Sequence, residues 1–288
     1  MTLEQAPLLK KFFSRGDTGL CDHTLGGALM WRNCFHTRFS WDDCCLYFKS
    51  EVGPGKWAFT PPTGDWKVGI ERLKKHCEET GEVFLLCSVS EEQREWIEKR
   101  YPGYHSVPAR DWFDYLYLRE KLQTLSGKKL SGQRNHRNYF VKTYQNWRFE
   151  ALNSQNVSLA KEFFFRYNES TEKNSEYFQE EKKAVAEVLD NLEIYGFFGG
   201  MILVEDRVVA FSLGEIIGDT IFVHVEKADR EYRGSYQIMV TEFLSHFADE
   251  TVVYVNREED VGDPGLRYSK EAYHPERLLA KYTISSEL

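Results

Sequence analysis

Two side chains with acid–base chemistry lie two residues apart in one short segment. Residues 221–226 alternate as in a strand, which puts Phe222, His224 and Glu226 on one face. His224 and Glu226 can therefore face one pocket, where an imidazole or a carboxylate could accept a proton. The alternative is that each of them forms an ordinary ion pair on the surface or between domains.

The most distinctive composition lies in residues 127–148. This stretch has no acidic residue, but it carries six basic side chains and four interleaved aromatic ones: Lys128, Lys129, Arg134, Arg137, Lys142 and Arg148, with Tyr139, Phe140, Tyr144 and Trp147. Such a band predicts a phosphate-binding site, because basic side chains donate charge-assisted hydrogen bonds and rings can stack on bases. An amphipathic linker helix with a solvated basic face explains the pattern equally well.

The cysteines raise the question of a metal site. Several lie close to histidines or to one another: Cys21 and His23, Cys34 and His36, and Cys44 and Cys45. Thiolates and imidazoles are ligands that zinc prefers. No C-x-x-C spacing occurs, however, and consecutive cysteines rarely both reach one tetrahedral ion. We therefore predict reduced structural cysteines and no metal.

The secondary-structure signals come in an order that repeats. In the first half we predict strand 57–60, helix 68–79, strand 83–89, helix 91–101 and strand 113–118. In the second half we predict strand 220–226, helix 236–248, strand 252–256, helix 265–273 and strand 278–283. The shared order favours two copies of one α/β unit, although chance alternation in an α/β protein would look similar.

Composition limits the class of protein. The 288 residues are 42% hydrophobic and 28% charged, which excludes a disordered or fibrous chain and allows one large or two ordinary domains. The net charge of −8 means that any surface for nucleic acid has to be local. The first 20 residues lack the apolar core of a signal peptide, and no apolar run approaches the roughly 20 residues that cross a bilayer. We therefore expect a cytoplasmic protein with no transmembrane segment.

Three motifs together resemble the family known as phosphatidylglycerol lysyltransferase C-terminal domain-like. They are residues 125–140, residues 225–229 with 234–237, and residues 256–260 with 265–267 and 273–275. The resemblance implies an α/β (mixed α+β) fold of two tandem GNAT-like units, the acetyltransferase type, each a mixed sheet flanked by helices. We place a structural N-terminal unit in residues 1–125, a basic linker helix in 126–150, and a C-terminal unit with the catalytic cleft in 151–288.

The resemblance also assigns roles around that cleft. In a GNAT-like unit, strands 220–226 and 252–256 run parallel and splay apart at their carboxyl ends. The side chains expected to converge there are Glu226, Lys227, Asn256, Arg257 and Asp260. Glu226 or His224 would be the base for acyl transfer, and Lys227 or Arg257 would stabilise the oxyanion. Asp260 or Glu215 would hold a cationic amino group.

Other positions that match the family's motifs are expected to bind substrate. Arg134, Asn135 and Asn138 belong to the basic motif, where we expect a phosphate or the acceptor end of a tRNA. Gln237, Tyr273 and His274 complete the predicted substrate-binding residues. For Tyr273 and His274, packing against the last strand is an equally good interpretation.

The loop 226–238 bears on the identity of the donor. Acetyl-CoA enzymes hold pyrophosphate on a loop of the form R/Q-x-x-G-x-G/A, but here, counting from Arg233, Tyr236 and Ile238 fill the two small positions. We therefore favour an aminoacyl-tRNA or another activated acyl donor, with no further cofactor.

Membrane-bound relatives use a lipid acceptor; here we expect a soluble or peripheral one that the sequence does not identify. The alternatives are an acyl-CoA-dependent N-acetyltransferase and a non-catalytic protein that binds a metabolite or RNA.

Overall fold

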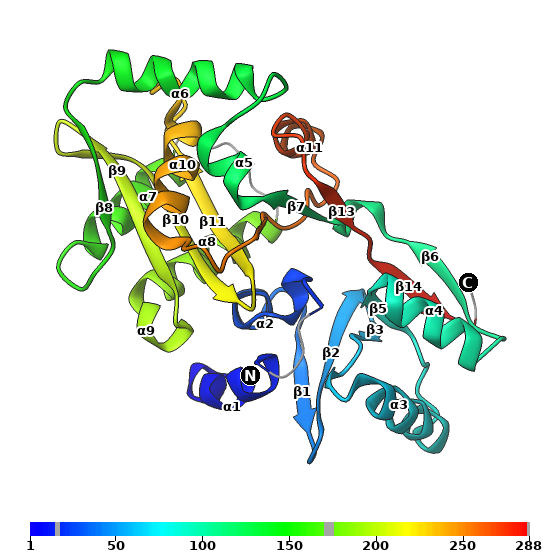
Figure 1. Ribbon diagram of the computed structural model, residues 1–288. Helices are drawn as coiled ribbons and strands as arrows, with labels where there is room; N and C mark the ends of the chain where they lie inside the picture. Colours follow the sequence, from blue (N-terminus) through cyan, green and yellow to red (C-terminus); the bar gives the residue numbers. More distant parts are fainter. Residues whose placement is uncertain (15–17, 170–175, 287–288) are drawn as a thin grey trace. The chain divides into compact units, whose positions relative to one another are not determined.

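The protein folds into two compact units, each of which draws on separate stretches of sequence. The computed structural model describes residues 1–14, 18–169 and 176–286. The first unit contains Met1–Asp114, Glu259–Gly262 and Leu278–Leu288, and the second contains Tyr115–Glu258 and Asp263–Arg277. Figure 1 shows the helices and strands coloured along the chain. The two sheets are both mixed and flanked by helices, which confirms the predicted α/β (mixed α+β) class.

The first unit is built on helices packed against a sheet. Its strands are β1 (Arg38–Trp41), β2 (Cys45–Gly53), β3 (Lys56–Phe59), β4 (Thr63–Gly64), β5 (Leu86–Val89), β6 (His105–Pro108) and β14 (Tyr282–Ser285). Its helices are α1 (Ala6–Phe13), α2 (Leu25–Met30), α3 (Trp66–Thr80) and α4 (Glu91–Arg100), with 3-10 turns at Leu3–Gln5, Cys21–His23 and Arg110–Trp112. The strand order is β1-β2-β3-β5-β14-β6, and β4 pairs with β2. Ile70 and Leu73 of α3 and Ile97 of α4 share one hydrophobic core with Val89 of β5.

The second unit also has a seven-stranded sheet, with helices on both faces. Its strands are β7 (Asp114–Leu118), β8 (Trp147–Ala151), β9 (Phe198–Val204), β10 (Arg207–Ile217), β11 (Thr220–Ala228), β12 (Tyr254–Asn256) and β13 (Arg277–Leu279). Its helices are α5 (Arg119–Thr124), α6 (Ser131–Thr143), α7 (Val157–Glu169), α8 (Glu176–Asp190), α9 (Leu192–Tyr195), α10 (Ser235–Phe247) and α11 (Pro264–Glu271). The strand order is β13-β7-β12-β11-β10-β9-β8. Among the described residues, no helix is long and apolar enough to span a membrane.

Aromatic side chains fix which helix covers which face of this sheet. Phe211 of β10 packs edge to face against Phe163 and Phe164 of α7, with ring centroids 6.0 and 5.9 Å apart. Gly214 lies three residues further along β10 and therefore faces the other side, where a Cβ would lie 3.4 Å from the ring of Phe243 on α10. Helices α7 and α10 thus cover opposite faces of the sheet.

The two predicted repeats exchange their last strands. Strand β7, expected to close the first repeat, pairs with β12 in the second sheet, where Tyr117 lies opposite Val255. Strand β14, expected to close the second repeat, pairs with β5 in the first sheet, where Tyr282 lies opposite Val89. The boundaries we predicted at residues 125 and 150 therefore shift. The second unit already begins at Tyr115 and includes the basic segment, and the end of the chain belongs to the first unit.

Candidate functional site

A buried ion pair joins the ends of the parallel strands β11 and β12. Phe222 of β11 lies opposite Asn256 of β12, and the two strands run in the same direction, as predicted. Glu226 lies near the end of β11, and Arg257 follows the last residue of β12. Arg257 Nη2 donates to Glu226 Oε1 across 2.7 Å, and the two side chains are only 10% and 9% exposed. Burial opposes the charge on Arg257, but attraction to Glu226 outweighs it and raises the pKa of the guanidinium.

Tyr273 covers this ion pair from the segment that follows α11. Its ring centroid lies 4.7 Å from Arg257 Cζ, which is the geometry of a cation–π contact. The side chain is buried, and burial raises the pKa of the hydroxyl, so this group stays protonated near neutral pH. Lys270 of α11 donates to the backbone carbonyl of Arg257 at 2.5 Å and holds the chain in place there.

Three buried polar atoms of this cluster have no hydrogen-bond partner among the described residues. They are Oε2 of Glu226, Nη1 of Arg257 and the hydroxyl oxygen of Tyr273. A buried polar atom without a partner costs roughly 1–3 kcal/mol, so such atoms are rare in native proteins. Together they offer an anionic acceptor, a cationic donor and a hydroxyl. A ligand that carries both an amine and a carbonyl group would satisfy all three.

A chain of side-chain hydrogen bonds links this cluster to α6. Gln237 lies on α10. Gln237 Nε2 donates to Gln133 Oε1 on α6 across 2.8 Å. Gln133 Nε2 in turn donates at 3.3 Å to the carbonyl of Ala272, the residue before Tyr273. The predicted basic motif on α6 and the Glu226 cluster are therefore connected by direct contacts.

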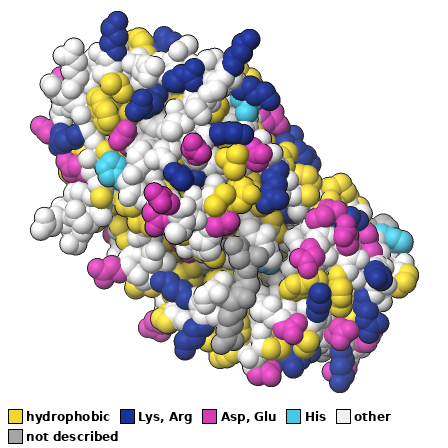
Figure 2. All heavy atoms as spheres, viewed as in Figure 1, with side chains coloured by type: hydrophobic (Ala, Val, Ile, Leu, Met, Phe, Trp, Pro, Cys, Tyr) yellow, Lys and Arg dark blue, Asp and Glu magenta, His cyan; other side chains and the backbone are white. Residues whose placement is uncertain are grey.

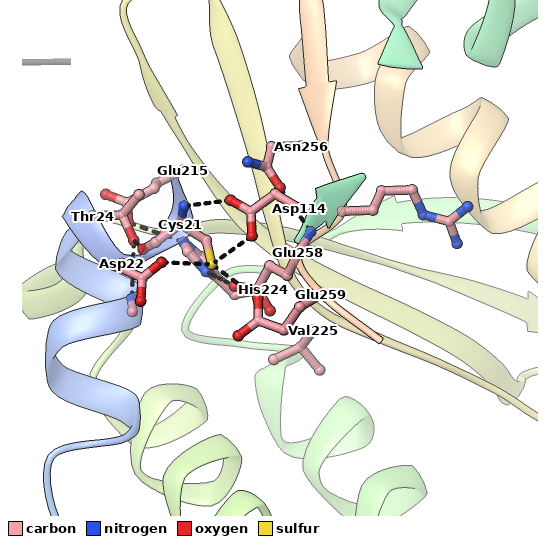
Figure 3. Close-up of polar contacts among 12 residues, drawn as sticks. Cys21, Asp22, Thr24, Asp114, Glu215, His224, Val225, Asn256, Glu258 and Glu259 are labelled. Atoms are coloured by element: carbon pink, nitrogen blue, oxygen red, sulfur yellow. Dashed lines mark hydrogen bonds and ion pairs between the residues drawn. The ribbon is translucent and has the colours of Figure 1, made fainter. Parts of the chain in front are cut away.

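His224 belongs to a different cluster, between two carboxylates. Its Nε2 lies 2.9 Å from Glu215 Oε1, and its Nδ1 lies 2.7 Å from Glu258 Oε1 (Figure 3). The ring stacks on Phe197, and the side chain is 1% exposed. Burial alone would lower the pKa of His224, but the hydrogen bonds to both carboxylates outweigh it and raise the pKa to about 9. His224 is therefore protonated near neutral pH and has no free nitrogen with which to act as a base.

A β-bulge separates His224 from Glu226. The register between β10 and β11 shifts by one residue, which leaves His224 as an extra residue in β11. Glu226 lies opposite Ser212, whereas His224 bonds to Glu215, and these two β10 residues are three positions apart. Side chains three positions apart on a strand point to opposite faces, as do the residues opposite them. The predicted common face is therefore wrong.

Lys227 and Asn256 are engaged away from the ion pair. Lys227 Nζ lies 2.7 Å from Glu181 of α8, on the face of the sheet opposite that of its neighbour Glu226. Asn256 is fully buried, and its Oδ1 accepts the backbone N–H of Glu258 at 2.7 Å. The structure thus places Lys227 in an ion pair and Asn256 in a turn. Of the two predicted oxyanion donors, Arg257 is the one with an unpaired donor atom beside Glu226.

Asp260 and His274 are also not part of the cluster. Asp260 belongs to the first unit, where its side chain accepts from Arg110 Nη1 at 3.0 Å and from the backbone of Gly262 at 2.9 Å. His274 is exposed, and its backbone N–H donates to the carbonyl of Glu271 in a turn. Their predicted substrate contacts are therefore not supported by the positions they take.

The basic segment splits into engaged arginines and open lysines. Arg134 Nη1 donates to the backbone carbonyls of Leu125 and Gly127 at 2.5 and 3.1 Å, so this side chain closes the turn between α5 and α6. The other two arginines also have partners inside the unit: Arg137 with Thr241 and Glu242, and Arg148 with Glu150 and Asp206. The predicted phosphate contact of Arg134 is therefore replaced by a structural one.

Three lysines and two asparagines are among the exposed residues of this segment. Lys128, Lys129 and Lys142 form no ion pair with the described residues, and Asn135 and Asn138 are exposed on α6. Figure 2 shows Lys and Arg side chains gathered along the upper edge of the visible face, where Figure 1 places α6. This local positive surface is available to an anionic ligand.

Comparison with known proteins identifies the family. Residues 14–285 match the family model described as phosphatidylglycerol lysyltransferase, C-terminal. The chain belongs to this family. An uncharacterized protein of Mycoplasmoides gallisepticum is 25% identical over 192 residues, which cover 66% of this chain and 61% of that protein. The chain thus matches about three fifths of the length of this curated relative.

Two solved structures share the fold of this phosphatidylglycerol lysyltransferase C-terminal domain. A conserved protein of unknown function from Bacteroides thetaiotaomicron VPI-5482 is 32% identical, with a TM-score of 0.88 over 99% of this chain and 97% of that one. L-PGS from Bacillus licheniformis is 14% identical, with a TM-score of 0.69 over 97% of this chain and 91% of that one. At that identity the second likeness concerns the fold alone. The description of the family names a lysyltransferase.

Two residues of these clusters were not among those predicted for this family member. Glu258 holds His224, and Gln133 connects α6 to Gln237. Both lie inside the motifs that carry the family resemblance, in residues 256–260 and 125–140, and that is the signal that could have found them. Neither could be placed from spacing alone, because their partners are more than thirty residues away in the chain.

Proposed function

We propose that this protein is an acyltransferase that moves an aminoacyl group from an activated ester, most specifically an aminoacyl-tRNA, to an amine or hydroxyl acceptor. The observation that supports this proposal is the set of three unpaired buried atoms on Glu226, Arg257 and Tyr273. Among the described residues, no other cluster combines a buried carboxylate oxygen without a hydrogen-bond partner and two buried donors without one.

Each of the three atoms has a role in this reaction. Glu226 Oε2 accepts the proton of the attacking amine or hydroxyl as that group bonds to the carbonyl carbon. Arg257 Nη1 and the Tyr273 hydroxyl donate to the carbonyl oxygen as it becomes negative. The ester C–O bond then breaks, and the terminal ribose oxygen of the tRNA leaves with a proton returned through Glu226. The aminoacyl ester is already activated, so no covalent enzyme intermediate is needed.

The turn before α10 favours an ester donor over an acyl-CoA. This helix begins after Gly234, where acetyl-CoA enzymes bring pyrophosphate to the backbone. A Cβ at position 234 would lie only 2.2 Å from the carbonyl oxygen of His136 on α6, so there is no room for a side chain there. Helix α6 therefore packs against the side of the turn that the glycine leaves open. The exposed Lys128, Lys129 and Lys142 supply a separate surface for the phosphates of a tRNA.

The test is transfer of a radiolabelled amino acid from charged tRNA to acceptors in a cell extract. We expect transfer with the unchanged protein and a decrease of about 10²–10⁴-fold in Glu226→Gln, because a general base contributes an effect of that size. Tyr273→Phe removes a hydroxyl that has no partner, so it should slow transfer without lowering the free energy of unfolding. Glu181→Gln, on the other face of the sheet, is the matched control and should transfer normally.

Two outcomes would contradict the proposal. Unchanged transfer in folded Glu226→Gln would remove the assigned base. A rise in melting temperature with acetyl-CoA and none with charged tRNA would identify the acyl-CoA alternative, because a ligand that binds the native state stabilises it. The acceptor and the cytoplasmic location stay predictions that this experiment does not address.

A further inference from the structure

The sulfur atoms of the consecutive residues Cys44 and Cys45 face each other in the first unit. Neighbouring residues of a strand normally point to opposite faces of the sheet. Here β2 begins only at Cys45, and the bend before it turns Cys44 to the same side, so that the two Sγ atoms lie 3.4 Å apart. Asp42 holds this bend, because its Oδ1 accepts the backbone N–H groups of Cys44 and Cys45 at 3.0 and 2.8 Å.

The surroundings leave this pair open on one side. Cys45 is buried and Cys44 is half-buried, so Cys44 is the partly exposed member of the pair. Two glycines make room for it: a Cβ on Gly69 would lie 2.9 Å from Cys45 Sγ, and one on Gly64 would lie 2.2 Å from the carbonyl oxygen of Cys44. A carboxylate oxygen of Asp42 and both sulfurs lie within 4.8 Å of one another.

We propose that Cys44, Cys45 and Asp42 form a binding site for a thiophilic divalent metal ion of the zinc type. Two sulfurs bound to one tetrahedral zinc at roughly 2.3 Å each stand about 3.8 Å apart, so the observed 3.4 Å needs only a small adjustment. Two thiolates and one carboxylate give three protein ligands, and water completes an open tetrahedral site. The site departs from the sequence-based expectation of purely structural cysteines.

The histidines that the sequence suggested as partners take no part in this site. His23 Nδ1 lies 2.9 Å from Thr18 Oγ1, and the exposed His36 pairs with Glu51 at 2.8 Å. The metal site proposed here therefore rests on the two sulfurs and one carboxylate alone.

A second cluster of possible ligands already contains a cation of the protein itself. Cys21, Asp114 and Glu259 lie close together, as Figure 3 shows. The buried Lys281 ammonium lies 2.7 Å from Asp114 and 3.3 Å from the Cys21 sulfur. A metal ion there would have to displace a charged group that is buried in the unit. The Cys44 pair has no such buried competitor among the described residues.

The cation next to the Cys44 pair is Arg72, whose side chain is partly exposed. Its Nη1 is 3.2 Å from Cys44 Sγ and 2.7 Å from Asp42 Oδ2, and its side chain is 45% exposed. The same guanidinium also pairs with Asp43 at 2.9 Å, so it can keep that partner while a metal ion takes the sulfurs and Asp42. Because Arg72 repels a second cation, its removal should strengthen metal binding.

The experiment is a titration of the reduced, metal-free full chain with Cd²⁺, followed by the ultraviolet absorption of cadmium–thiolate bonds, and with Zn²⁺ in competition. We expect one ion per chain, binding at least about tenfold weaker in Cys44→Ser and several-fold tighter in Arg72→Gln. Affinity should rise with pH, because the thiols lose their protons when they bind the ion. Cys34→Ser, a thiol outside the cluster, is the control and should bind normally.

Each contrary result would overturn the site. Absence of saturable binding, or binding that Cys44→Ser leaves unchanged, would show that the two sulfurs do not share an ion. Weaker binding in Arg72→Gln would also overturn it, because an ion that takes the place of the Arg72 guanidinium beside the sulfurs and Asp42 must bind more tightly once that cation is removed. Cys44 is half-buried and serine is similar to it in size, so the Cys44→Ser protein is expected to fold.

Discussion

Arg257 donates one hydrogen bond to Glu226 at 2.7 Å, while the other oxygen of that carboxylate and another nitrogen of that guanidinium have no partner among the described residues. The pair is thus buried, but one polar atom of each side chain lacks a hydrogen-bond partner among the described residues. Breaking a buried ion pair by removing one partner typically costs about 3–5 kcal/mol, because the remaining charge is left uncompensated. We expect decreases of that size in Glu226→Gln and in Arg257→Met, measured as free energies of unfolding in urea.

The double variant decides whether the decrease comes from the pair itself. Glu226→Gln with Arg257→Met leaves no buried charge, so its stability should fall clearly less than the sum of the two single variants. The comparison of all four proteins gives the coupling free energy directly. Additive decreases would mean that each side chain stabilises the fold through other interactions. The coupling free energy of the ion pair would then be close to zero.

His224 makes the stability of the second unit depend on pH. Its pKa is raised from the usual 6.5 to about 9 by Glu215 and Glu258, against the effect of burial. The stabilisation is therefore fully present below pH 6.5 and is lost as the pH rises through 9, a difference of about 3 kcal/mol. Unfolding free energies measured between pH 6 and 10 should fall over this window. In His224→Gln the fall should be absent, and an equal fall in both proteins would refute the assignment.

Local sequence signals predicted the elements well but could not predict their pairing. Helix 68–79 appears as Trp66–Thr80, helix 91–101 as Glu91–Arg100, and the parallel strands 220–226 and 252–256 as β11 and β12. The exchange of β7 and β14 between sheets was not predictable, because periodicity describes one segment and says nothing about a partner more than a hundred residues away.

The same limit explains which of the predicted site residues lie together in the structure. Glu226, Arg257 and Tyr273 come from matched motifs and do lie together. His224 was misplaced because the alternation argument assumes a regular strand, and a one-residue bulge cancels it. Arg134 was misplaced because a basic residue in a basic segment gives no sign that its guanidinium is used by backbone carbonyls of a neighbouring turn.

Gly234 tests the packing of α6 on the turn before α10. Its φ of +95° lies in the left-handed region, and a Cβ would meet the carbonyl oxygen of His136 at 2.2 Å. Gly234→Ala should therefore lower the free energy of unfolding by more than about 2 kcal/mol. Gly132→Ala on α6 is the matched control, since no atom lies within 4 Å of its Cβ, and it should be neutral or stabilising by up to about 1 kcal/mol. Equal effects of the two substitutions would rule out the close packing.

Because Arg134 bonds to the backbone and the lysines are exposed, we expect different effects from substitutions at Arg134 and at Lys128 and Lys129. Changing Lys128 and Lys129 to Gln should weaken tRNA binding, and the dependence of log K on log salt concentration should become shallower by roughly 0.7–0.9 for each phosphate that is no longer neutralised. Arg134→Met removes the hydrogen bonds to Leu125 and Gly127, so it should lower the free energy of unfolding and leave the salt slope unchanged. Filter binding at several salt concentrations, with urea unfolding of the same proteins, separates the two effects. A salt slope that changes in Arg134→Met but not in the lysine variant would assign the phosphate to the arginine and refute the division.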